Sequence, residues 1–430
     1  MPRSAVPAFA LLLLALLSIT VVAGVGGAQV HTLSSDGVEV DMDTSELPPG
    51  TADDIQQTID DEGNETAEYL TMPTDELDRA GIETGGIDVA TAIGRDAGDH
   101  RAEFFREDLE GRLGNAATDE ERRTVLVAAG DRLNDRIAVL QTRERNALDP
   151  ESADPTTGEL FRTFATVDAE SRGLLEVVRV LHEENAATSD NPLSDRDLAT
   201  YRARLEPLYG PVRERIATAT AGDDSIEVYL EVRDTDVSMT TLVDGDERFV
   251  REAHVRDARQ EDQPDRLGFS GAEDRFEELY PWVVENNAGF NIFVVGGAPY
   301  LHHADVYVVS AAHDHGFGSP EDLTTYIDGA TTDVFYETQQ LDPTLVTTRG
   351  TTERSDDLEL RLNWSRAGWP VAVEVIDLET DASVDASISF DGENVGSTGG
   401  DRLWTIGERG TITVEATHEG RSVATEMVLT

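Results

Sequence analysis

Four of the nine histidines lie in one short stretch, "HHADVYVVSAAHDHGFG", which covers residues 302–318. Histidine and aspartate are common ligands of zinc and related metals, so this stretch is a candidate metal site. In an extended strand each residue adds about 3.3 Å, which would place His303 and His313 roughly 33 Å apart. The two pairs of histidines therefore cannot share one ion unless the chain turns between them.

His313 and His315 remain as the candidate ligands of a divalent metal. They are two residues apart, so an extended chain places both side chains on one face, about 7 Å from each other. A third ligand would have to come from Asp305, Asp314 or Asp328 through the fold. The alternative is a polar loop in which both histidines bond to backbone carbonyls, and we favour it because the pair has no third signature ligand.

The residue types that are missing exclude several kinds of chemistry. All 34 basic residues are arginine, and there is no cysteine. Without lysine there is no P-loop lysine and no Schiff base, and without cysteine there is no thiolate nucleophile, iron–sulfur cluster or disulfide. The stretch "GFSGAE" around Ser270 lacks the second spaced glycine of a Gly-x-Ser-x-Gly elbow. We therefore predict no catalytic residues and no cofactor.

The charge balance is the dominant feature of the composition. The chain has 86 acidic residues against its 34 arginines, a formal net charge of −52. Self-repulsion at this charge would destabilise a compact fold at moderate ionic strength, whereas about 1 M salt shortens the Debye length to about 3 Å. We therefore predict adaptation to high salt. We also predict no nucleic-acid binding, which requires basic patches.

Residues 1–28 have the pattern of a secretory signal. One arginine precedes an apolar run, residues 5–25, and small residues follow it up to Ala28. We expect cleavage near Ala28 and an extracellular or cell-surface location. The alternative is an uncleaved membrane anchor, because the run is close to the ~17 residues that span a bilayer. Sequons at Asn64 and Asn363 would permit N-glycosylation.

The next two segments differ in their pattern. Residues 29–94 are acidic and contain breakers such as "LPPG", so we expect a loosely ordered segment. In residues 95–222 apolar residues recur at helical spacing, which predicts an antiparallel helical bundle with coiled-coil-like hairpins. The stripes are Phe105 to Leu113, Leu126 to Leu140, Leu160 to Leu181, and Leu198 to Val212. Ser194 is expected to cap the fourth helix, and Pro207 and Pro211 to kink or divide it.

Residues 223–345 change to a pattern that predicts a mixed α+β domain. We expect strands at "SIEVYLEVRD", "FNIFVVGG", "DVYVVSA" and "TDVFYETQQL", and a hairpin around Asp244-Gly245. Helices are expected at "AEDRFEELYPWVVENN", ended by Pro281, and at "SPEDLTTYIDGA". Residues 346–357 are expected to be a linker.

Residues 358–430 contain strand patterns separated by turns roughly every eight to twelve residues, which predicts an antiparallel β-sandwich. The stretch "VEVIDLETDASVDASISFDGENVGSTGGDRLWTI" has the order of parts of carboxypeptidase regulatory-like, transthyretin-like domains, which this region resembles. Where those repeats have a Thr-Gly turn, this sequence has "TDAS". The resemblance implies a non-catalytic surface module for spacing or adhesion.

The whole chain resembles a family of exported proteins of halophilic archaea, notably in "YLTMPTDELDRAGIETGGIDV", "ELYPW" and "YIDGATTDVFYE". This resemblance implies no particular activity. We thus expect a multidomain α+β protein of the cell envelope that acts as a binding or structural module. Its partner would be an unknown protein or envelope component. Self-association through the helices into a homo-oligomer is an open alternative. The membrane would be contacted only through an uncleaved N-terminal segment. The alternative is a metal-binding receptor or metal-dependent enzyme that uses His313 and His315.

Overall fold

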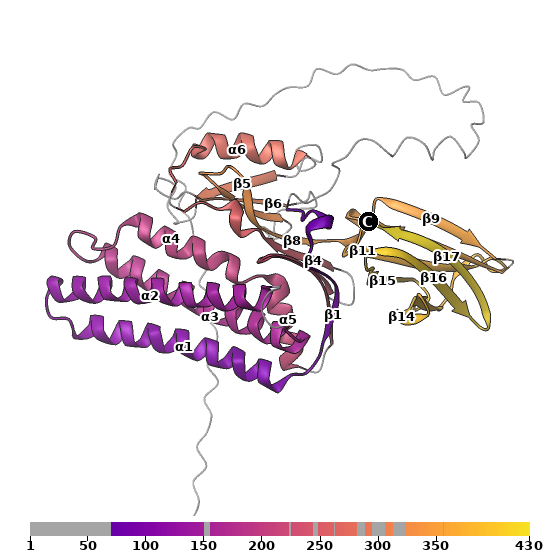
Figure 1. Cartoon of the computed structure of the whole chain (residues 1–430), viewed down its shortest axis with the longest axis horizontal. Coiled ribbons are helices and arrows are strands. Elements are labelled where there is room, and N and C mark those ends of the chain that lie inside the picture. The colour runs from indigo at the N-terminus through magenta and orange to yellow at the C-terminus, as the bar shows by residue number, and fades with distance from the viewer. Residues whose placement is uncertain are drawn as a thin grey trace, which may run out of the picture. The chain divides into compact units, whose positions relative to one another are not determined.

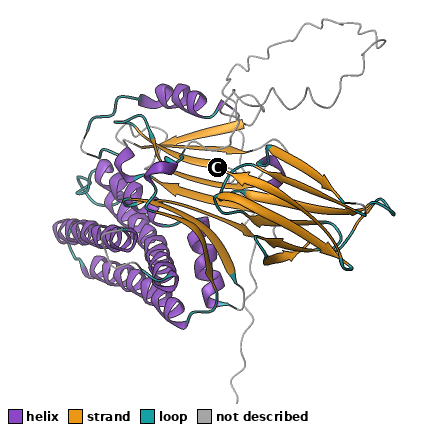
Figure 2. Cartoon of the chain, turned by 45° about the vertical axis from the view of Figure 1, so that its right-hand side comes forward, coloured by secondary structure: helices purple, strands orange, loops and turns teal. Residues whose placement is uncertain are grey.

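The computed structural model describes residues 70–149, 155–222, 225–243, 248–261, 263–281, 289–294, 306–312, 323–355 and 357–430. In these ranges the chain is an α+β protein, with helices first and antiparallel sheets after them (Figures 1 and 2). The predicted signal segment and Asn64 lie outside these ranges. Within them, no helix has the length and apolar character needed to cross a membrane.

Residues 89–221 form the helical part, and their caps explain where the helices begin. The helices are α1 (Val89–Asn115), α2 (Asp119–Leu148), α3 (Thr157–Ala186), α4 (Asp195–Leu205) and α5 (Pro211–Ala221). Thr118 and Thr156 each form a capping box, with Glu121 and Glu159, at the start of α2 and α3. Most of the predicted apolar stripes are buried in a common core, whereas Leu160, Phe164 and Val212 join a second core with the sheet. The helices α1 and α2 fold back on each other (Figure 1).

The fourth helical stripe is divided as predicted. Ser194 caps α4 through a capping box with Asp197, and α4 ends at Leu205 before Pro207. Pro211 is the first residue of α5, where its missing N–H costs nothing. The prediction of the cap and of the division is therefore confirmed.

Small residues bring α1 and α3 unusually close together. A Cβ atom at Gly173 would lie 2.5 Å from the Cβ of Ala102, and one at Gly98 would lie 2.9 Å from the carbonyl oxygen of Thr166. Gly94, Gly98 and Ala102 recur every four residues, so they form one face of α1. Because this face is pressed against α3, the opposite side of α1 is left toward solvent.

The second part is an eight-stranded antiparallel sheet with the order β1-β2-β3-β4-β8-β7-β6-β5. Its strands are β1 (Arg79–Gly85), β2 (Ile226–Arg233), β3 (Asp236–Val243), β4 (Arg248–His254), β5 (Gly289–Val294), β6 (Val306–Ala312), β7 (Leu323–Asp328) and β8 (Val334–Leu341). The helix α6 (Gly268–Leu279) ends two residues before Pro281 and packs through Ala272 and Phe276 on residues of β6 and β7.

Two elements of this sheet differ from the prediction. β1 lies in the segment that its acidic composition predicted to be loosely ordered, yet it pairs along its whole length with β2, from Arg79 opposite Val232 to Gly85 opposite Ile226. β7 replaces the helix predicted from "SPEDLTTYIDGA". Its β-branched and aromatic side chains favour a strand, and it pairs with both β6 and β8.

The two faces of the sheet contact different parts of the chain. Successive side chains of a strand point to opposite faces, and β2 follows this rule. Val228 and Leu230 belong to a core shared with α3 and α5, whereas Tyr229 between them joins the core of the C-terminal sandwich. Thr240 Oγ1 donates to the carbonyl of Gly368 (2.7 Å), where a Cβ atom would lie 2.3 Å from the Tyr229 ring.

A buried ionic network joins the helices to the sheet. Arg213 on α5 is 1% exposed, and it contacts Glu144 on α2 (2.5 Å) and Glu252 on β4 (3.2 Å). The Glu252 carboxylate also accepts the backbone N–H of Val212 (3.1 Å). A Cβ atom at Gly210 would lie 2.0 Å from an oxygen of Glu252, so any other residue there would displace this carboxylate. The network lies beneath the helices, so we interpret it as structural.

The C-terminal part is an antiparallel β-sandwich, as predicted. Its first sheet contains β9 (Arg349–Arg354), β10 (Leu358–Trp364), β11 (Pro370–Asp377), β12 (Ala382–Ser383) and β15 (Arg402–Ile406). Its second contains β13 (Ser387–Phe390), β14 (Glu393–Ser397), β16 (Gly410–His418) and β17 (Arg421–Leu429). Alternating apolar residues of both sheets form its core.

One of these strands falls on the segment that was predicted to be a linker, and another is short and irregular. β9 is an edge strand within residues 346–357, and its charged, threonine-rich sequence is typical of exposed sheet edges. β14 forms from "ENVGS" by pairing with β13, with an irregular register next to Ile388. The possible glycosylation residue Asn363 lies in β10, and its side chain is exposed.

Candidate functional site: the groove between α1 and α2

Most of the predicted metal ligands lie outside the residues that the structure describes, so the structure does not test the predicted metal site. His302, His303, His313 and His315 lie outside the described ranges, as do Asp305 and Asp314. Asp328 is fully buried at the end of β7, where its Oδ2 accepts the backbone N–H of Thr331 (2.9 Å). Within the described ranges no group of three histidine or acidic side chains could hold a metal. The metal site therefore stays a prediction.

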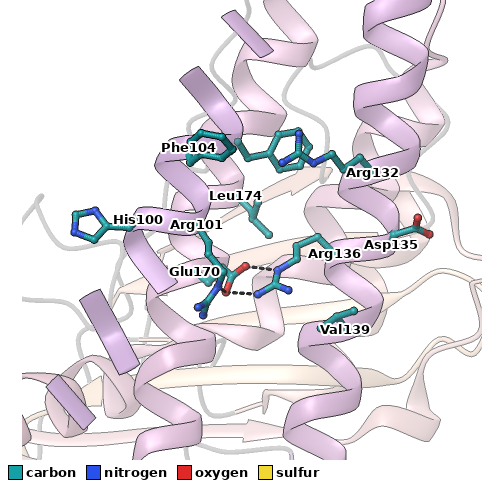
Figure 3. Close-up of a pocket in the computed structure, with 10 residues that line it drawn as sticks. His100, Arg101, Phe104, Arg132, Asp135, Arg136, Val139, Glu170 and Leu174 are labelled. Atoms are coloured by element: carbon teal, nitrogen blue, oxygen red, sulfur yellow. Dashed lines mark hydrogen bonds and ion pairs between the residues drawn. The ribbon is translucent and has the colours of Figure 1, made fainter. Parts of the chain in front are cut away.

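A groove of about 490 Å³ lies between α1 and α2. Both helices pack more extensively on α3 than on each other, so α3 forms the floor of the groove. Figure 3 shows Phe104 and Arg101 on α1, Glu170 on α3, and Arg132 and Arg136 on α2 around it. We call this site the α1/α2 groove.

A single buried carboxylate lies at the centre of the α1/α2 groove. Glu170 is 1% exposed, and it accepts hydrogen bonds from Arg101 (2.9 Å) and from Arg136 (2.7 Å, with a second, shorter bond). Figure 3 shows Glu170 between these two arginines, while His100 and Asp135 point outward. One carboxylate is thus surrounded by two guanidinium groups, so this centre carries a net positive charge.

One face of α2 carries further arginines, of which Arg132 pairs with Asp108 on α1 (2.9 Å). Arg132, Arg136, Val139 and Arg143 follow a four-three-four spacing and therefore share a face of the helix. Arg143 is exposed and makes no ion pair or hydrogen bond with the described residues. The pKa of Arg143 is lowered mainly by partial loss of hydration and, to a smaller extent, by the positive charge of Arg101. The lowered pKa therefore reflects mainly the partial burial of the Arg143 guanidinium, with a smaller contribution from the neighbouring arginines.

Two exposed apolar side chains line the groove. Phe104 on α1 is 64% exposed, and Val139 on α2 is 51% exposed. Scattered apolar residues are normal on a surface, but exposed apolar residues that line a groove make it a candidate binding surface. The groove therefore combines an apolar wall with guanidinium donors.

This arrangement is suited to binding, and the sequence contained a signal for it. Guanidinium groups bind carboxylates with paired hydrogen bonds, and an exposed aromatic ring provides apolar contact area. The four-three-four repeat of Arg132, Arg136, Val139 and Arg143 is the same helical spacing that identifies the core stripes. It was missed because a repeat of arginines on a helix is usually read as a solvated face.

Three family models match the chain. Residues 1–225 match the domain of unknown function DUF7096. The chain belongs to this family. Residues 228–346 match the family of unknown function DUF7094, and residues 349–425 match an archaeal fibronectin-III type-like domain. The α1/α2 groove thus lies in the DUF7096 region.

The match over residues 349–425 agrees with the observed β-sandwich and identifies it as fibronectin-III type-like. The resemblance noted in the sequence was to carboxypeptidase regulatory-like domains, whereas the matching model is fibronectin-like. The three matches are consistent with an archaeal protein that has a C-terminal β-sandwich. No curated protein and no solved structure gives a significant match to the chain.

Proposed function

We propose that the protein is an exported, salt-adapted, non-catalytic module of the cell envelope, and that its α1/α2 groove binds an acidic amphipathic helix of a partner protein. The observation that carries the proposal is that Arg101, Arg132 and Arg136 line the same groove as the exposed ring of Phe104. The C-terminal sandwich would then be a non-catalytic surface module, in line with the spacing or adhesion role that the sequence resemblance implies.

Charge complementarity determines the kind of partner. The chain as a whole carries a net charge of −52, so a locally positive groove is an exception on its surface. A second copy that presented the same groove would bring arginines against arginines, and like charges across an interface are unfavourable. A partner helix with carboxylates beside an apolar stripe could pair with the arginines of the groove and pack against its exposed apolar side chains.

The dimensions of the groove favour a helix as the ligand. On α2 the lining residues run from Arg132 to Val139, seven steps or about 10 Å at 1.5 Å per residue. About two turns of a partner helix would match this length. Its apolar stripe would lie against Phe104 and Val139, as in other helix-in-groove complexes.

High salt restricts how this binding operates. At about 1 M salt the Debye length is about 3 Å, so only carboxylates in direct contact with the arginines would contribute. The apolar contact with Phe104 is not screened by salt. We therefore expect the apolar wall to supply most of the affinity and the arginines to select the sign of the partner's charge. Self-association through coiled-coil-like helices remains a separate prediction.

Two designed peptides test the proposal on the full-length protein. Both are helical with the same apolar stripe, and glutamate flanks the stripe in one and lysine in the other. Fluorescence anisotropy should show that the acidic peptide binds more tightly than the basic one. A general charge effect on a protein of net charge −52 predicts the opposite order. Equal binding, or tighter binding of the basic peptide, would refute the proposed groove.

A further inference from the structure

A second arginine-rich pocket uses a different face of α2. It has a volume of about 220 Å³ and lies where α2, α4 and the end of β4 meet. We propose that this pocket binds a small multivalent oxyanion, namely a phosphate group. The residues that carry the argument are Arg145, Arg204, Arg256, Arg259 and His254.

The arginines of this pocket outnumber the carboxylates that contact them. Arg145 donates only to neutral groups on its own helix, the carbonyl of Gln141 (3.4 Å) and Thr142 Oγ1 (3.2 Å). Arg204 donates to Asn134 Oδ1 (2.5 Å) and to the side-chain oxygen of Gln141 (2.7 Å), and it also pairs with Glu261 (3.7 Å), which lines the pocket and pairs with Arg259 as well (3.2 Å). Four arginines thus face two carboxylates, Glu261 and the Glu144 that pairs with Arg256. The excess positive charge is available to an anion.

The inner wall contains buried polar atoms that lack hydrogen bonds. His254 is 8% exposed, and its Nδ1 has no hydrogen-bond partner among the described residues. Arg256 is 14% exposed and forms an ion pair with Glu144 (2.8 Å), while its Nη1 has no hydrogen-bond partner in the same part of the chain. Buried polar groups are nearly always paired, so these atoms indicate a ligand.

The electrostatic environment of His254 supports the sign of that ligand. The pKa of His254 is lowered well below its usual value, mainly by burial and to a smaller extent by the nearby positive charge of Arg256. The imidazole is therefore neutral, and it can donate one hydrogen bond to an oxyanion. An anion bound beside Arg256 would offset the positive field and raise the pKa of His254.

The size and donor set identify the chemical class. A volume of about 220 Å³ is below the ~300–1,000 Å³ of pockets for drug-sized molecules and well above the ~30 Å³ of one water. Arginine forks match the geometry of phosphate oxygens. A tetrahedral dianion can accept from several of these arginines at once, whereas a halide offers one acceptor atom.

Isothermal titration calorimetry of the full chain at fixed ionic strength tests this inference. Inorganic phosphate and a phosphate monoester are titrated in parallel, with acetate as a monovalent comparison. We expect phosphate or the monoester to bind and acetate to bind more weakly. If inorganic phosphate binds more tightly, the natural ligand is free phosphate; if the monoester binds more tightly, the ligand is a phosphate group attached to a larger molecule. Absence of binding by both would overturn the proposal.

Two arginine variants provide the matched comparison. Arg145→Gln removes a donor that bonds only within α2, so it should fold normally and weaken binding about tenfold or more. Arg179→Gln makes the same change on the exposed face of α3 and should leave binding unchanged. Binding should also raise the pKa of His254 in an NMR titration. Equal affinity of the two variants, or an unmoved His254 pKa, would contradict the assigned pocket.

Discussion

Replacing Arg213 with methionine is expected to lower the free energy of unfolding by about 3–5 kcal/mol. Arg213 is the cation between two buried carboxylates, Glu144 and Glu252, which are 0% and 2% exposed. Methionine fills a similar volume but leaves the carboxylates without this partner. The loss should be measured by chemical denaturation, and it should exceed that of any surface substitution.

The loss should also depend on pH, because of Glu252. Burial raises the pKa of Glu252 from 4.5 to about 7. Stability that comes from this raised pKa is complete below pH 4.5 and is lost as pH rises through about 7. At pH 5 Glu252 holds its proton and needs Arg213 less, whereas at pH 8 it is ionised and depends on Arg213. We therefore expect a larger loss at pH 8 than at pH 5.

An exposed arginine provides the control for this measurement. Arg179 on α3 pairs with Glu176 and Glu183 at the surface, and Arg179→Met should change the free energy of unfolding by at most about 1 kcal/mol. If Arg213→Met were no more destabilising than Arg179→Met, the network would not hold the helices on the sheet. A loss that was equal at both pH values would show that Glu252 is ionised throughout.

Replacing Phe104 with alanine is expected to weaken binding of the acidic peptide by about 30-fold. Aromatic residues at the centre of interfaces commonly contribute 2 kcal/mol or more, which corresponds to this factor. Because Phe104 is 64% exposed, the same change should alter the free energy of unfolding by at most about 0.5 kcal/mol. Anisotropy titrations and denaturation curves would separate the two effects.

A second exposed phenylalanine gives the matched control. Phe269 on α6 is 53% exposed and lies outside the groove, so Phe269→Ala should leave peptide affinity unchanged. If both variants bound equally well, the apolar wall would not be part of the binding surface.

The helical part was predictable because its signals are local. The spacing of Leu160 to Leu181, the capping pattern at Ser194 and the prolines at 207 and 211 each act within a few residues. β1 and β7 were not predictable in the same way. Their strand conformation depends on partners that lie far along the chain, as with Arg79 and Val232. A tertiary pairing of this kind overrides the local composition and capping signals.

The binding surfaces were harder to predict than the fold. His313 and His315 were predicted as metal ligands because histidine commonly binds metals, but both lie outside the described residues. The α1/α2 groove is built from arginines and an exposed phenylalanine on separate helices. Gly98 packs against Thr166 and Gly173 packs against Ala102, so α1 faces α3 with its small residues and Phe104 lies on another face. No sequence window contains both partners of either contact.

Photo-crosslinking at position 104 tests the central claim most directly. The photoreactive residue p-benzoylphenylalanine is placed at Phe104 of the full-length protein in the cells that produce it, and at Phe269 as the control. The account predicts adducts from position 104 alone, and peptide mapping should place them on an acidic amphipathic helix of another protein. Adducts that are the same at both positions, that map to a basic or extended segment, or that fail to form at position 104 would contradict it.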